Sequence, residues 1–127
     1  MRVYAYVIVA LGSAIGGALR YGVFVASARL LGTGWPYGTL TINVAGSLAI
    51  GAVVGYFAVR GLSASAWFLF LTTGVLGGFT TFSAFSLDVV VLYERGHTGL
   101  AALYVVSSVI LSVVAAFLAM TLVRRLL

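Results

Sequence analysis

Four long runs of apolar residues, separated by three short polar turns, make up almost the whole chain. The turns read GTGWP at 32–36, RGLSAS at 60–65 and ERGHTG at 94–99. Glycine, serine and charged residues gathered in this way mark connections between helices. The pattern predicts helices at about 3–30, 37–59, 66–93 and 98–123. Since a bilayer needs about 20 apolar residues per helix, we expect an all-α membrane protein with a single transmembrane domain over residues 1–127.

The third run contains the stretch GGFTTFSAF at 77–85, which weakens a helix in the middle of the span. We predict a break near 77–80, with a half-helix beginning again at Thr80 or Thr81. Irregular backbone at membrane depth is tolerated only where protein buries it or where it lines a cavity, so a break implies a site. The amides that start the second half favour an anion, and the carbonyls that close the first half favour a cation.

Polar residues within the spans form two stripes at helical spacing, one in the second helix and one in the fourth. The stripes comprise Thr39, Asn43 and Ser47, and Tyr104, Ser108 and Ser112. Residues four positions apart share a helix face, so each stripe presents amide and hydroxyl groups together. The alternative is that these side chains bond to their own helix and pack against neighbours. Neutral donors without a ring of acidic groups suit a dehydrated anion.

Two phenylalanines, Phe82 and Phe85, follow the predicted break and fall on one helix face. A phenyl ring has a positive edge around a negative face, so rings presented edge-on can contact an anion. Ordinary aromatic packing is the alternative that the spacing leaves open.

Composition agrees with a membrane location, because 63% of the 127 residues are hydrophobic and only 7% are charged. The net charge of +5 comes from seven arginines against two acidic residues, and only Arg124 and Arg125 are adjacent. A nucleic-acid interface needs clustered charge on a solvated face, so we expect no nucleic-acid partner. The absence of cysteine excludes disulfides and thiolate metal sites.

The arginines also bear on orientation in the membrane. In a four-span topology, four of them share one side of the membrane: Arg2, Arg60, Arg124 and Arg125. The other side has Arg29 and Arg95, and also Arg20 if that residue is counted with the helix ends. The bias of basic loop residues sets orientation, so this small difference favours insertion in both directions. Dual insertion permits an antiparallel homodimer, and the alternative is a monomer or bundle subunit of fixed orientation.

Glycines at four-residue spacing occur in the first two runs, as Gly12 with Gly16 and Gly51 with Gly55. Such pairs let helix backbones approach closely in lipid, where no hydrophobic drive brings helices together. They predict close packing of the first two helices and nothing more specific.

Three blocks of the chain, GGALRY at 16–21, GTLTINVAGSLAIG at 38–51 and GVLGGFTTFSAFSLD at 74–88, resemble the bacterial Fluc (CrcB) fluoride channels. The resemblance covers nearly the whole length, in order, spacing and four-span layout. The sequence departs from the usual family pattern at Ala84, where threonine is common, and at Asp88, where glutamate is common.

The resemblance implies a dual-topology homodimer with two antiparallel pores, which lets cytoplasmic fluoride leave passively across the bacterial plasma (inner) membrane. It implies a fluoride pathway formed by Asn43, Phe82, Phe85, Tyr104, Ser108 and Ser112, with the hydroxyls of Thr39, Thr81 and Ser83. A structural sodium ion at the dimer axis would be held by main-chain carbonyls of Gly77 and Thr80. Arg20 would lie near an aqueous vestibule, unless it is only an interfacial arginine that reaches toward water.

Two other functions remain open on the sequence. A small proton-coupled multidrug transporter shares the size and layout but needs an intramembrane carboxylate, and the nearest candidate is Asp88, about two turns beyond the break. A non-transporting assembly subunit needs only the glycine packing. We expect no enzyme activity, because the single histidine, His97, lies in a turn without an evident nucleophile or metal partner.

Overall fold

The computed structural model describes the backbone of residues 2–127 and the side chains from Val3 onward, so the side chain of Arg2 lies outside the described residues. Its helices form four spans: α1 (Arg2–Leu31); α2 (Tyr37–Val59); a third span of α3 (Ala66–Leu69), η1 (Phe70–Leu76), α4 (Gly77–Phe79) and α5 (Phe82–Glu94); and α6 (Thr98–Leu126). Each span is long and apolar enough to cross a membrane. Even the shortest, α2, is about 34 Å long at 1.5 Å per residue. The expectation of an all-α protein with four membrane-length helices is therefore confirmed.

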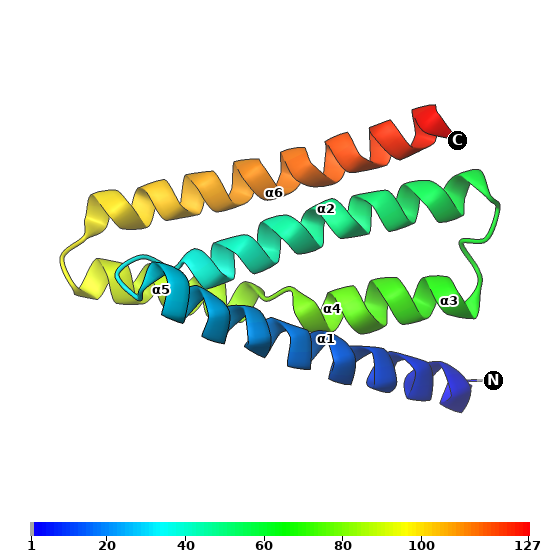
Figure 1. Ribbon diagram of the computed structural model, residues 1–127, viewed down its shortest axis with the longest axis horizontal. Helices are drawn as coiled ribbons and strands as arrows, with labels where there is room; N and C mark the ends of the chain where they lie inside the picture. Colours follow the sequence, from blue (N-terminus) through cyan, green and yellow to red (C-terminus); the bar gives the residue numbers. More distant parts are fainter. Residues whose placement is uncertain (1) are drawn as a thin grey trace.

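The spans form an elongated bundle in which α2 lies between α6 and the third span, and α1 crosses the third span (Figure 1). The chain termini and the turn from α2 to α3 are at one end, and the other two turns are at the opposite end. Glycines with positive φ, Gly61 and Gly96, follow α2 and α5. They end these helices because glycine adopts the left-handed conformation without steric penalty.

Close helix contacts depend on the glycines of α1 and α2. A Cβ atom on Gly16 would collide with the carbonyl oxygen of Val75 in η1, and one on Gly51 would collide with that of Ala116 in α6. Both helices pack tightly through these glycines, as the spacing predicts. The glycine pair of α1 faces the third span, and Gly51 and Gly55 of α2 face α6. Small residues thus set the distances at which α2, α6 and the third span surround the site described below.

The third span is interrupted between α4 and α5. Thr80 has φ −77° and ψ 157°, and Thr81 has φ −151° and ψ 117°, both extended conformations. Gly77 has right-handed helical angles, so the paired glycines are not themselves the unwound residues. Gly78 instead allows contact with α1, because a Cβ atom there would lie 2.6 Å from the Ser13 carbonyl oxygen.

Candidate functional site

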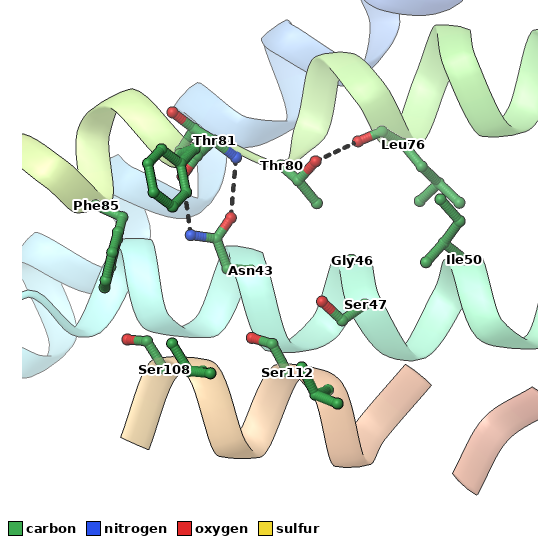
Figure 2. A pocket seen from close by; sticks show the side chains of 13 residues that line it. Asn43, Gly46, Ser47, Ile50, Leu76, Thr80, Thr81, Phe85, Ser108 and Ser112 are labelled. Carbon is green, nitrogen blue, oxygen red and sulfur yellow. Dashed lines mark hydrogen bonds between the residues drawn. The ribbon is translucent and has the colours of Figure 1, made fainter. Parts of the chain in front are cut away.

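Asn43 of α2 closes the gap in the hydrogen bonding of the third span. Its side-chain Nδ2 donates to the carbonyl oxygen of Thr81 over 2.9 Å, and the Thr81 N–H donates to Asn43 Oδ1 over 2.9 Å (Figure 2). The amide therefore pairs with both polar groups of one extended residue. Unpaired backbone groups are costly in a low-dielectric environment, so this pairing allows the break to exist within a membrane span.

Threonine side chains complete the ends of the two half-helices. The Thr80 N–H and hydroxyl both donate to the Leu76 carbonyl, at 3.0 and 2.9 Å, and close the upstream half. The Thr81 hydroxyl accepts from the N–H of Ala84 at 3.2 Å and caps α5. Because α5 begins at Phe82, the partial positive charge of its first turn lies at the break.

A cavity of about 440 Å³ lies beside the break, between α2, the third span and α6. Its polar lining comprises Asn43, Ser47, Thr80, Thr81, Ser108 and Ser112. The hydroxyl oxygens of Ser108 and Ser112 are buried and have no hydrogen-bond partner among the described residues. Figure 2 shows both serines on α6, facing α2 across the cavity. Since buried polar groups are nearly always paired, two unpaired hydroxyls on one cavity wall are available to a bound ligand.

The two predicted phenylalanines also line this cavity. Their ring centroids are 5.4 Å apart, with a tilt of 47° between the ring planes. Phe85 packs in turn on the ring of Tyr104, with centroids 5.3 Å apart. Phe82 is 79% exposed in the single chain, so one side of the aromatic pair is uncovered.

The two polar stripes enter the cavity only in part. Asn43 and Ser47 of the first stripe line it, whereas Thr39 is buried elsewhere on α2. Tyr104 of the second stripe does not line it either, because its fully buried ring is held by a hydrogen bond of 3.0 Å from its hydroxyl to Asp88 Oδ2. In each predicted stripe, therefore, two residues line the cavity and the third is buried in contact with neighbouring residues.

Arg20 and Ser83 lie on the other side of the break, in a second cavity of about 500 Å³. Thr81 lines both cavities, so both of them reach the same extended residue at the break. The Arg20 guanidinium makes a long contact of 3.5 Å from Nη1 to the Thr80 carbonyl oxygen. The structure therefore places this cation at the level of the break and not at the end of the bundle.

Main-chain oxygens at the break suit a hard monovalent cation. In a continuous helix the Thr81 N–H would bond to the Gly77 carbonyl, but here it donates to Asn43. That leaves the Gly77 carbonyl without its helical donor. No group of three acidic, histidine or cysteine side chains that could hold a metal occurs among residues 2–127 as described. The predicted sodium ligands thus fit in chemistry, although Arg20 approaches one lone pair of Thr80.

Sequence reasoning missed the π-helix η1 and the pairing of Asp88 with Tyr104. The π-helix has no evident signal in FLTTGVL, although π turns often occur near functional sites. The second feature had a signal, because an acidic residue within a membrane span needs a polar partner and Tyr104 is one of few in the facing spans.

Comparison with known proteins decides the family. The sequence profile of the family described as "CrcB-like protein, Camphor Resistance (CrcB)" matches residues 7–120. The chain belongs to the CrcB family. It is a multi-pass integral membrane protein, as its four spans and this CrcB membership together establish.

Curated CrcB relatives match over most of their length. The chain is 53% identical over 121 residues to "Fluoride-specific ion channel FluC 2" of Nitrobacter hamburgensis, covering 95% of this chain and 98% of that protein. It is 55% identical over 123 residues to "Fluoride-specific ion channel FluC" of Granulibacter bethesdensis, covering 97% of each chain. A protein of the same name from Rhodopseudomonas palustris is 51% identical over 121 residues, covering 95% of this chain and 98% of that protein.

Proposed function

We propose that this chain forms a fluoride channel that lets cytoplasmic fluoride leave passively across the bacterial inner membrane. The names of the curated relatives support the ion. The observation that carries the proposal is the cavity at the break, which presents the Asn43 amide and two unpaired serine hydroxyls.

The lining suits an anion that sheds its water. Nδ2 of Asn43 carries two hydrogens, and only one is used on the Thr81 carbonyl, so the second is available to an ion. Ser108 and Ser112 each supply a hydroxyl that can donate. The first turn of α5 adds partial positive charge, and none of the described residues that line this cavity is acidic. The fluoride ion would thus exchange water for neutral donors, without a cationic side chain that would hold it too tightly.

The phenylalanine rings extend this pathway. Phe82 and Phe85 line the same cavity as the donors, with a tilt of 47° between their ring planes. A positive ring edge attracts an anion weakly, which permits passage rather than capture. Beyond the break, Arg20 and Ser83 line the second cavity, which we assign as the vestibule where the arginine raises the local fluoride concentration.

We propose that the channel is an antiparallel homodimer with two pores. The cavity is only partly enclosed, and Phe82 in its lining is 79% exposed, so a single chain does not enclose the pathway. Because Arg20 lies at the break, it does not count toward the basic residues at either end of the bundle. One end then has two arginines, Arg29 and Arg95, and the other end has four. A difference of two basic residues is a weak orientation signal, which is compatible with insertion both ways.

A structural sodium ion completes the proposed dimer. The carbonyls of Gly77 and Thr80 would hold it, and sodium bound there would neutralise the partial negative charge of two upstream helix ends brought together. Within this chain, Asn43 prepares the site because it takes the Thr81 N–H away from Gly77.

Ion-specific efflux from liposomes tests the function. Purified protein should release fluoride much faster than chloride from loaded vesicles, with no dependence on a pH gradient. Exchange of organic cations for protons would support the multidrug transporter instead. The structure favours the channel, because the carboxylate of Asp88 is held by Tyr104 and lines neither cavity at the break. Vesicles that release neither ion would support the assembly subunit.

A further inference from the structure

An apolar groove of about 650 Å³ lies at the end of the bundle that carries the chain termini. Its walls include Ala52, Val53 and Phe57 of α2, Leu71 of η1, Val123 near the end of α6, and Leu127, which follows α6. The groove is separate from the ion cavity and shares no lining residue with it. Its volume lies within the range of about 300–1,000 Å³ that is usual for ligand pockets.

Arginines gather at the same end of the bundle. Arg124 and Arg125 lie in the last turn of α6, directly before two residues of the groove, Leu126 and Leu127. Arg60 follows α2, and its guanidinium lies 5.6 Å from the ring centre of Tyr56, another lining residue. Three arginines thus lie at the same end of the bundle as the apolar groove, and the ends of membrane-spanning helices are where lipid headgroups meet acyl chains.

We propose that this groove binds an anionic phospholipid, with an acyl chain against the apolar wall and the phosphate at Arg60, Arg124 and Arg125. Charge favours this occupant over a second copy of the chain. The opposite end of the bundle carries Arg29, Arg95 and Glu94, so an antiparallel copy would bring no net negative charge to the groove. A parallel copy would bring the same cations and would be repelled.

Native mass spectrometry of the full chain in detergent, with phosphatidylglycerol or phosphatidylcholine added, tests the site. We expect wild-type protein to retain phosphatidylglycerol in preference to phosphatidylcholine. One arginine near an anionic lipid surface contributes about a fivefold change in affinity. The double variant Arg60→Gln/Arg124→Gln should therefore lower phosphatidylglycerol retention at least about tenfold.

The matched control is Arg29→Gln/Arg95→Gln, which removes the same charge from the other end and should change retention less than about twofold. Filling the groove with Ala52→Phe should lower the binding of both lipids. Undiminished phosphatidylglycerol retention in the double variant or in Ala52→Phe would overturn the proposal, as would an equal loss in the control. Because the chain has no cysteine, Val53→Cys provides a further check. Efficient disulfide formation between two copies would show that a second chain covers the groove, and would also overturn the proposal.

Discussion

Replacing Asn43 by alanine tests the central feature of the site, which is the repair of a broken span by a side chain from another helix. The substitution removes both bonds to Thr81, each 2.9 Å long. Thr81 is only 7% exposed, so water reaches its N–H and carbonyl poorly. A buried polar group left unpaired costs about 1–3 kcal/mol, and two groups therefore cost about 2–6 kcal/mol.

The consequences of Asn43→Ala should appear in two measurements. Thermal unfolding in detergent should occur at a midpoint at least about 8 °C lower, taking roughly 4 °C per kcal/mol for a domain of this size. Fluoride efflux from liposomes should fall by at least about tenfold, because the amide donor in the cavity is lost together with the geometry of the break.

Ser47→Ala is the matched control for this variant. Ser47 lies one turn along α2 and lines the same cavity, but it does not bond to Thr81. Its removal should shift the unfolding midpoint by less than about 2 °C. The role assigned to the amide would be refuted if Asn43→Ala and Ser47→Ala had the same unfolding midpoint and the same rate of fluoride efflux.

Three further predictions concern the ion pathway. Ser108→Ala/Ser112→Ala should leave stability unchanged or raise it by up to about 6 kcal/mol, since it removes two unpaired hydroxyls at about 1–3 kcal/mol each, while fluoride efflux slows. A clear loss of thermal stability would show that these hydroxyls have protein partners. Phe82→Ile and Phe85→Ile should each sharply cut efflux while chemical cross-linking still detects the dimer, and wild-type rates in both variants would contradict the contact between ring edges and the ion. Removal of sodium from purified dimers should abolish fluoride flux, and unchanged flux in sodium-free buffer would count against the structural ion.

The spans could be predicted from sequence because the rule that produces them is local. Lipid offers no hydrogen bonds, so a long apolar run must satisfy its own backbone as a helix, and polar turns mark its ends. The π-helix η1 could not be predicted in the same way. Its hydrogen bonds differ from those of an α-helix by one residue, and close packing of Gly74 against Gly12 accompanies it without a distinctive sequence pattern.

The candidate site was only partly predictable because helical spacing shows which residues share a face but not what that face meets. Tyr104, Ser108 and Ser112 share one face of α6, yet the serines reach the cavity while the tyrosine bonds to Asp88. The difference depends on α5, which packs against α6 and brings Asp88 to the Tyr104 hydroxyl. Sequence spacing contains no information on which part of α6 a neighbouring helix contacts.

The position of the break follows from the same kind of distant contact. Glycine tolerates extended backbone best, so local propensity favours unwinding at Gly77 and Gly78. Asn43, however, offers one acceptor and one donor that match the N–H and carbonyl of a single residue, and its place on α2 sets it opposite Thr81. Both glycines then remain helical and Gly78 allows α1 to approach, while threonine hydroxyls cap the two half-helices. The extended residues are thus those whose backbone groups find partners outside the span, because in lipid an unpaired peptide group costs more than the modest preference of glycine for unwinding provides.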